Sequence, residues 1–408
     1  MLITKIKGRM VLDSRGIPTV EAEIFSNKIS AKASVPSGAS TGSNEALELR
    51  DNAKEFLGKG VSKAIDNINK IIAPKLIGIN AADQETIDKI MLGLDGTKQK
   101  SKLGANAILA VSIACCKLAA KLQNMPTFMH IAKLAKEKPK RMPIPMLNLI
   151  NGGKHAGLSN DIQEHMIMPL GFDTFYERLK ASVEIYQTLK KMLKKAYGAR
   201  AILLADEGGF VWFKNSEERL EFLQKAIENA NYSLEEIKFA LDCAATEFFK
   251  DGKYFLYEKE YNAESLLEYY SSLCNKFPIS SIEDPFAEND FEGFAEALKK
   301  LKIQIVADDL VVTNAERLKL AIKHNACNAI ILKPNQIGTI TETLQTAKLA
   351  KENNIKIIAS HRSGETEDSF IADLCIGINA EFCKFGAPAR SDRNAKYNQL
   401  LRIEEMLK

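Results

Sequence analysis

The sequence contains no Cys-x-x-Cys pair, and its seven cysteines are odd in number. Two of them, Cys115 and Cys116, are adjacent, and most of the others lie in apolar runs. This pattern argues against a disulfide framework. We therefore expect reduced, buried thiols and a cytoplasmic location.

The sequence also lacks a dense basic region. Its 56 Lys and Arg residues are scattered and nearly balanced by 52 Asp and Glu residues, which leaves a net charge of +4. Nucleic-acid binding requires a concentrated basic surface, so we do not expect a nucleic-acid partner. A small anionic substrate would need only a local basic cluster.

No segment has the apolar length of a signal peptide or a membrane span. The first nine residues, Met-Leu-Ile-Thr-Lys-Ile-Lys-Gly-Arg, lack the long apolar stretch of a signal peptide. The most apolar helical candidate, residues 103–122, carries Asn106, Ser112 and Lys117. It therefore falls short of the roughly 20 apolar residues that cross a bilayer. We expect a buried core helix there and no membrane span.

The 408 residues suffice for two domains. The first part, residues 1–135, predicts a short antiparallel sheet followed by helices, an α+β cap. Its expected strands are 2–12, 18–25 and 29–35, and its expected helices are 53–73, 83–93 and 104–136. A charged, proline-containing stretch at 136–141 predicts a linker. The second domain, 140–408, ends in an expected helix at 394–407.

The second domain shows short apolar runs that end in a charged residue about every 25 positions. Such runs alternating with helical stretches predict an eight-stranded parallel β/α barrel of the TIM type. All strands of that fold point the same way, so their carboxyl ends converge on one mouth. The residues that we expect there are Asp242, Glu283, Asp308, Lys333, His361, Arg362 and Lys384.

Three carboxylates, Asp242, Glu283 and Asp308, close successive predicted strands. Together they form an oxygen-only ligand set, which suits Mg²⁺ better than Zn²⁺. Each acid alone is more often a helix cap or one half of a surface ion pair. Their repetition at strand ends favours a shared metal site.

Lys333 and Lys384 lie on the same predicted face as the acids. A lysine that is desolvated or crowded by cations can lose its proton near neutral pH and act as a base. Lys333 is the stronger candidate, whereas Lys384 fits equally well as a fixed cation. The run Ser360-His361-Arg362-Ser363 offers a guanidinium fork and hydroxyls that match a phosphate.

Glycine-rich segments supply the remaining candidates. Glu207 precedes Gly208 and Gly209 and is a candidate acid, although Asp-Glu-Gly-Gly is also a common turn. The segments 37–42 and 151–157 are loops that could close over a ligand or could simply be flexible. Gln163 and Glu164 follow the second loop on a predicted strand.

Several long motifs in the same order resemble the enolase family nearly end to end. They are Val-Leu-Asp-Ser-Arg-Gly-x-Pro-Thr-Val-Glu (11–21), Pro-Ser-Gly-Ala-Ser-Thr-Gly (36–42), Lys-Leu-Gly-Ala-Asn-Ala-Ile-Leu (102–109), Ser-Ile-Glu-Asp-Pro-Phe (281–286), Lys-Pro-Asn-Gln-Ile-Gly-Thr (333–339) and Ser-His-Arg-Ser-Gly-Glu-Thr-Glu-Asp (360–368). The combination is far more specific than any single motif.

The resemblance implies a glycolytic lyase that interconverts 2-phospho-D-glycerate and phosphoenolpyruvate. It implies Lys333 as the base and Glu207 as the acid. It also implies two Mg²⁺ ions, the first on Asp242, Glu283 and Asp308 and the second, arriving with substrate, on Ser40. The substrate-contacting positions that it implies are His155, Gln163, Glu164, Glu283, Asp308, Ser360, His361, Arg362, Ser363 and Lys384.

The resemblance further implies a homodimer or a higher multiple, with Glu21 and Arg402 paired across the interface. Some positions differ from the family pattern: Ile17 stands where Asn is usual, His165 where Phe is usual, and Val211-Trp212 where Ala-Pro is usual.

Two other functions compete with this one. Related racemases and cycloisomerases typically use a Lys-x-Lys base motif, but Asp206-Glu207 occupies the corresponding place here. A non-catalytic binding protein is the third alternative, against which the intact set of acids and lysines argues.

Overall fold

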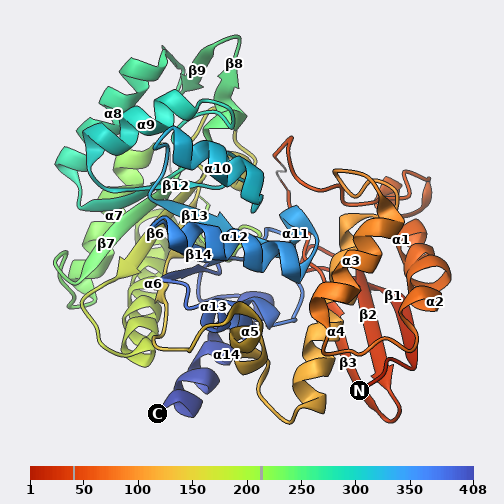
Figure 1. Ribbon diagram of the computed structural model, residues 1–408. Helices are drawn as coiled ribbons and strands as arrows, with labels where there is room; N and C mark the ends of the chain where they lie inside the picture. The colour runs from red at the N-terminus through yellow and green to blue at the C-terminus, as the bar shows by residue number, and fades with distance from the viewer. Residues whose placement is uncertain (40–41, 212–214) are drawn as a thin grey trace.

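The computed structural model describes residues 1–39, 42–211 and 215–408 and shows two domains side by side (Figure 1). The N-terminal domain lies at the right of the figure in red and orange. The barrel domain occupies the left side in yellow, green and blue, and holds the C-terminus. All seven cysteines are free, and six are buried, as expected from their apolar surroundings.

The N-terminal sheet is antiparallel in the order β1-β2-β3. Its strands are β1 (Lys5–Leu12), β2 (Pro18–Ser26) and β3 (Ile29–Ser34). The turn between β1 and β2 is built by Asp13, whose Oδ1 accepts hydrogen bonds from the backbone N–H of Arg15 at 2.8 Å and of Ile17 at 2.9 Å. An aspartate that binds backbone two residues ahead favours such a turn. The three predicted strands are confirmed.

Helices follow this sheet in the chain and pack against it either directly or through the longest of them. They are α1 (Ser62–Asp66), η2 (Asn67–Ile72), α2 (Ala73–Leu76), α3 (Gln84–Asp95), α4 (Ala105–Leu122) and α5 (Thr127–Ala135), preceded by the single turn η1 (Glu55–Gly58). The helix expected over 53–73 begins only at 62, because Phe56 and Leu57 have left-handed backbone conformations. The helix expected over 104–136 is two helices, with Pro126 at the start of α5.

Helix α4 is the core helix that its composition predicts. It is the one helix in the described residues that is long and apolar enough to cross a membrane, and 83% of it is buried. It packs against β2 and β3, so its apolar surface is covered by the sheet.

The C-terminal sheet closes into a barrel. Its order is β4-β15-β14-β13-β12-β11-β7-β6-β5, and only Met146 separates β4 from β5, so the first and last positions belong to one stretch of chain. The strands are β4 (Ile144–Pro145), β5 (Leu147–Asn151), β6 (Glu164–Pro169), β7 (Ile237–Asp242), β11 (Ile279–Glu283), β12 (Gln304–Ala307), β13 (Ala329–Leu332), β14 (Lys356–Ser360) and β15 (Phe382–Lys384).

One strand departs from the parallel pattern that the sequence predicts. Strand β6 is antiparallel to both β5 and β7. The expectation that all strands point the same way was therefore wrong for β6. Because β6 runs in reverse, its first residue lies at the mouth, and Glu164 pairs in register with Asp242.

Helices surround the barrel on the outside (Figure 1). They are α6 (Phe175–Tyr197), α7 (Ser216–Asn229), α8 (Ala263–Lys276), α9 (Phe291–Leu301), α10 (Ala315–Lys323), α12 (Ile340–Glu352), α13 (Phe370–Gly377) and α14 (Ser391–Leu407). The connections between elements contain the short turns η3 (Gly153–Ala156), η4 (Ala199–Ile202), η5 (Ala245–Phe248) and α11 (Pro334–Ile337). A small antiparallel sheet contains β8 (Phe249–Lys250), β9 (Lys253–Leu256) and β10 (Lys259–Tyr261). The predicted terminal helix is confirmed by α14, which buries Tyr397, Leu400 and Ile403.

Polar contacts join the two domains next to the barrel mouth. Asp88 of α3 accepts hydrogen bonds from the backbone N–H of Thr341, at 2.9 Å, and from its hydroxyl, at 2.6 Å. The backbones of Ser37 and Gly364 exchange two hydrogen bonds of 2.8 and 2.9 Å. The segment after β3 is thereby held against the loop that carries the predicted phosphate-binding residues.

Candidate active site

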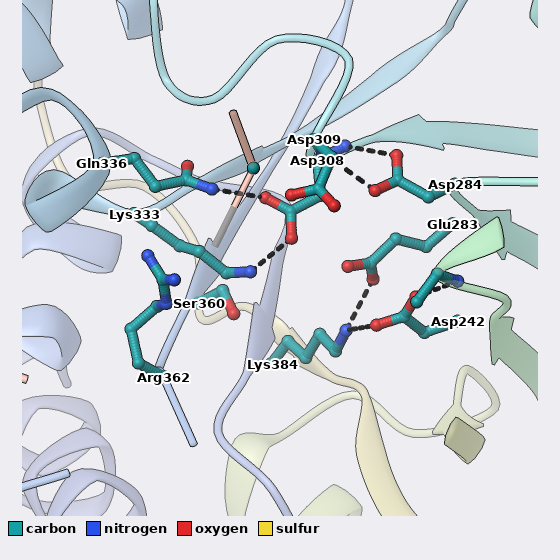
Figure 2. A network of polar contacts seen from close by, with 12 residues as sticks. Asp242, Glu283, Asp284, Asp308, Asp309, Lys333, Gln336, Ser360, Arg362 and Lys384 are labelled. Atoms are coloured by element: carbon teal, nitrogen blue, oxygen red, sulfur yellow. Dashed lines mark hydrogen bonds and ion pairs between the residues drawn. The ribbon is translucent and has the colours of Figure 1, made fainter. Parts of the chain in front are cut away.

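The predicted strand-end residues meet at the barrel mouth. Asp242, Glu283 and Lys384 are the last residues of β7, β11 and β15, while Asp308 and Lys333 directly follow β12 and β13. Figure 2 shows their side chains pointing toward one another. The sequence-based expectation of one charged mouth is confirmed.

Lys384 is the central cation of this cluster. Its Nζ lies 2.8 Å from Asp242 Oδ2, 2.7 Å from Glu283 Oε2 and 3.2 Å from Glu164 Oε2. Burial alone would lower the pKa of Lys384, but the three carboxylates raise it well above the ordinary lysine value. Lys384 is therefore a fixed positive charge. Figure 2 shows its contacts with Asp242 and Glu283.

Lys333 is paired with Asp308, and the backbone around it is fixed. The N–H of Lys333 donates to Thr313 Oγ1 at 2.8 Å, and Gln336 Nε2 donates to Asp308 Oδ1 at 2.9 Å. Burial would lower the pKa of Lys333, but Asp308 outweighs it and the pKa is raised. Lys333 is thus protonated while Asp308 remains its partner.

The acids of the mouth fit a divalent cation. Glu283 Oε1 is buried and accepts no hydrogen bond from any residue that the structure describes. Burial and the nearby Asp242 raise the pKa of Glu283 well above its usual range, because the negative charges are only partly balanced. The donor set of Asp242, Glu283 and Asp308 consists of oxygen alone, which matches Mg²⁺.

A second acidic group lies beside this one. Oxygens of Asp284, Asp308 and Asp309 lie within 4.8 Å of one another. Asp284 has a structural role, because its two oxygens accept hydrogen bonds from the backbone N–H groups of Asp308 and Asp309, each at 2.9 Å. Burial, followed by the charge of Asp308, raises the pKa of Asp309 to about 8. Sequence reasoning missed Asp284 and Asp309, which follow recognised acids directly in the chain.

The same cavity also contains two carboxyl groups and two histidines. His155 Nδ1 lies 3.4 Å from Glu164 Oε1 and 3.7 Å from Glu207 Oε1, and His361 Nε2 lies 3.4 Å from Glu207 Oε2. Burial lowers the pKa of both histidines, that of His361 to about 3, so both rings are neutral near pH 7. Burial and the nearby Glu207 raise the pKa of Glu164 well above its ordinary value.

Arg362 lies at the edge of the mouth and is held by the other domain. Its two Nη atoms bind the two oxygens of Glu45 at 2.9 and 3.2 Å. Buried Arg393 contacts the loop that carries Arg362, with its Nη1 2.6 Å from Nδ1 of the neighbouring His361. Sequence reasoning missed Glu45 and Arg393 as site residues, because their partners Arg362 and His361 lie 317 and 32 positions away in the chain.

One polar cavity unites nearly all the predicted site residues. Its lining includes His155, Gln163, Glu164, Glu207, Asp242, Asp308, Lys333, Ser360, His361, Arg362, Ser363 and Lys384. Glu283 lies beside the cavity, in contact with Lys384. Ser40 and Trp212 fall outside the described residues.

Two departures from the family pattern have a local structural role. Ile17 completes the turn of Asp13 through its backbone N–H, so the hairpin forms without Asn at this position. His165 is fully buried on β6, and its Nε2 lies 2.7 Å from the Ser216 hydroxyl. Val211 is the last described residue before the gap that contains Trp212.

Comparisons with known proteins agree with this geometry. The family model described as "Enolase, N-terminal domain" matches residues 3–131, and "Enolase, C-terminal TIM barrel domain" matches residues 139–408. The chain is 51% identical over 407 residues to the enolase of Methanocaldococcus jannaschii, which covers 99% of this chain and 95% of the relative. It is 52% identical over 411 residues to that of Thermococcus gammatolerans, with the same coverage.

Proposed function

The chain belongs to the enolase family, and on that premise we propose how its residues perform the reversible dehydration of 2-phospho-D-glycerate to phosphoenolpyruvate. The enzyme is a hydro-lyase of glycolysis that uses Mg²⁺. The observation that carries the assignment of roles is the arrangement of the mouth, where Lys333 and Glu207 line the same polar cavity.

Lys333 is the base that removes the proton from C2 of the substrate. Its Nζ reaches into the cavity from the end of β13. Asp308 raises its pKa, whereas the charges of Arg362 and Lys384 act in the opposite direction. With Asp308 engaged as a ligand of Mg²⁺, its charge would act less on Lys333, and these two cations would favour the neutral amine that accepts a proton.

Loss of the C2 proton places additional negative charge on the substrate carboxylate. Lys384 is protonated by its environment and stabilises that charge without rearrangement. Mg²⁺ held by Asp242, Glu283 and Asp308 would supply further positive charge to the same carboxylate. We assign a second Mg²⁺, arriving with substrate, to Ser40, on the analogy of the family.

Glu207 is the acid for the second half of the reaction. Hydroxide is a poor leaving group, so the hydroxyl on C3 needs a proton as its bond to carbon breaks. Glu207 and Glu164 are buried together with His155, and the raised pKa of Glu164 keeps a proton in this group of side chains. Burial would raise the pKa of Glu207, but His361 and His155 outweigh it and hold that pKa well below its usual range. The proton that Glu207 gives to the departing hydroxyl must therefore reach it from Glu164 in the substrate complex.

The remaining polar groups bind and orient the substrate. Arg362 and Ser363 bind the phosphate, with the fork of the guanidinium matching two phosphate oxygens. His155, Gln163, Ser360 and His361 line the same cavity and complete the contacts. Glu45 accepts hydrogen bonds from both Nη atoms of Arg362 in this structure, so a phosphate that used the same two atoms would displace Glu45.

The reaction can be tested by following the ultraviolet absorbance of phosphoenolpyruvate formed from 2-phosphoglycerate. The wild-type protein should produce it with Mg²⁺ and not with EDTA, and Lys333→Ala should not produce it in either condition. Absence of turnover in folded, Mg²⁺-loaded wild type would contradict the assignment and favour a different carboxylate substrate.

We further propose a homodimer in the cytoplasm. Free cysteines agree with a reducing compartment. Exposed apolar side chains on β1, Met10 and Leu12, and at Leu203 indicate surface that a second subunit could cover. Glu21 is paired within its own chain with Arg9 at 2.6 Å, while Arg402 is exposed and available to a partner.

A further inference from the structure

His155 reaches the active site from a segment without regular strand or long helix. Residues 152–163 join β5 to the reversed strand β6, and the single turn η3 within them carries His155. The ring must be held beside Glu164 and Glu207 for any role in catalysis. The groups that fix this segment therefore matter to the reaction.

A buried ion pair lies at the C-terminal end of this segment. Arg219, in the first turn of α7, is fully buried and binds Asp161 in a bidentate manner, Nη1 to Oδ1 at 2.8 Å and Nη2 to Oδ2 at 2.6 Å. Nη1 also donates to the backbone oxygen of Ile162 at 3.2 Å. One guanidinium thus binds two consecutive residues where the segment enters β6.

The same pair also fixes the start of the segment. Asp161 Oδ2 accepts the backbone N–H of Gly153 at 3.1 Å. A Cβ on Gly152 would lie 2.3 Å from Arg219 Nη1 and 2.6 Å from Asp161 Oδ2, so the backbone passes this pair at a distance that only glycine permits. Asp161 and Arg219 therefore join both ends of the segment on either side of His155.

A second connection runs from the same segment to the same helix. The backbone oxygen of Asn160 accepts the N–H of Tyr257 at 3.0 Å, and the Tyr257 hydroxyl lies 2.7 Å from Ser216 Oγ. Ser216, the first residue of α7, also contacts His165 at 2.7 Å. His165, next to Glu164 on β6, is thereby tied to the helix that carries Arg219.

We propose that Asp161 and Arg219 are positioning residues for the dehydration, fixing the segment that presents His155 to Glu164 and Glu207. They touch neither the substrate cavity nor the strand-end acids and act through His155. This inference rests on the proposed function, specifically on the role of His155 as a substrate contact.

The test is a double-mutant cycle between Arg219→Met and His155→Ala, with kcat/KM for 2-phosphoglycerate measured at saturating Mg²⁺. Arg219→Met should lower kcat/KM by roughly 10- to 100-fold, the scale of a loss caused by misplacing a contact residue. In the His155→Ala background the same substitution should change kcat/KM by no more than about twofold, because the residue it positions is gone.

The outcomes separate positioning from general stabilisation. Wild-type kcat/KM in Arg219→Met, or an equal loss with and without His155, would overturn the inference and leave the proposed function intact. Wild-type activity in His155→Ala would instead remove the proposed role of His155, and the inference with it.

Folding is checked by circular dichroism and thermal unfolding, with the assays run well below each midpoint. If Arg219→Met does not fold, Asp161→Asn takes its place in the cycle, since Asn retains the shape of Asp161 but lacks its charge and one of its two acceptor oxygens. Lys117→Met is the matched control: it removes a half-buried ion pair with Asp368 at the domain contact and should stay within about twofold of wild type.

Discussion

Lys384 is the residue on which the charge balance of the barrel mouth depends. It is buried and contacts three carboxylates at 2.7 to 3.2 Å. Removing one partner from a buried ion cluster leaves uncompensated charges and typically costs 3–5 kcal/mol, roughly. The cluster is therefore structural as well as functional.

We expect Lys384→Met to lower the free energy of unfolding of the metal-free protein by about 3–5 kcal/mol and to abolish turnover. Urea unfolding with EDTA measures the first effect, and the phosphoenolpyruvate assay measures the second. Lys319→Met, which breaks an exposed pair with Glu316, is the control and should be neutral in both measurements. Unchanged stability of Lys384→Met would show that the carboxylates do not depend on this lysine.

A buried acid away from the site gives a prediction about pH. Burial raises the pKa of Asp373, in α13, to about 6. Because this pKa is higher in the folded than in the unfolded protein, the protonated acid stabilises the fold at low pH, and this contribution is lost as pH rises through about 6.

Asp373→Asn should therefore stabilise the protein at pH 8 by up to about 3 kcal/mol and leave it unchanged at pH 4, since one pKa unit corresponds to ~1.4 kcal/mol. Chemical unfolding of wild type and variant at both pH values provides the measurement. A difference in stability that is the same at pH 4 and pH 8 would contradict the prediction.

At the scale of elements, helix α12 is capped from the other domain. Thr339 binds the N–H of Glu342 within the helix, while Asp88 of α3 accepts the N–H of Thr341. A side chain that satisfies a free N–H at a helix start is worth about 1 kcal/mol. This cap also links the domains beside α11, the turn that follows Lys333.

Asp88→Ala should accordingly lower the free energy of unfolding by about 1–2 kcal/mol, and Asp88→Asn, which retains an acceptor oxygen, should lower it less. Asp83→Ala removes the cap of α3 within one domain and serves as the matched comparison. Equal stability of Asp88→Ala and wild type would show that the cap contributes nothing.

The barrel strands show which parts of the fold and of the site could be predicted from the sequence. Asp242, Glu283 and Lys384 were identified because each ends a short apolar strand, and strand ends meet in a barrel. The reversed direction of β6 was not predicted, because its apolar pattern is the same in both directions. Glu45 was missed because a residue 317 positions away from its partner leaves no local signal. Arg393 was missed because its partner His361 lies 32 positions away, directly after β14.

At the scale of the whole molecule, metal binding should be coupled to stability. A ligand at 100 times its dissociation constant stabilises a folded protein by about 2.7 kcal/mol. Mg²⁺ should therefore raise the midpoint of thermal unfolding and EDTA should reverse the rise. Glu283→Gln should lose most of this response, and a full response in that variant would exclude Glu283 as a ligand.

The assembly gives a second prediction at this scale. Arg402→Glu should weaken the proposed dimer by roughly tenfold in its dissociation constant, since it places like charges opposite each other. The effect is limited because Arg9 and Lys32 already balance Glu21 within its own chain. Sedimentation velocity over a range of concentrations measures it, and an unchanged sedimentation coefficient would count against the Glu21–Arg402 pair.

Lys333 is assigned as the base at C2 and Glu207 as the acid at the C3 hydroxyl. Deuterium incorporation at C2 of 2-phosphoglycerate in D₂O tests these two roles most directly. Glu207→Gln should exchange the C2 proton and form little phosphoenolpyruvate, because it retains the base and lacks the acid. Lys333→Ala should show neither exchange nor product. Exchange at the wild-type rate in Lys333→Ala would contradict the account, because the base would then be another residue.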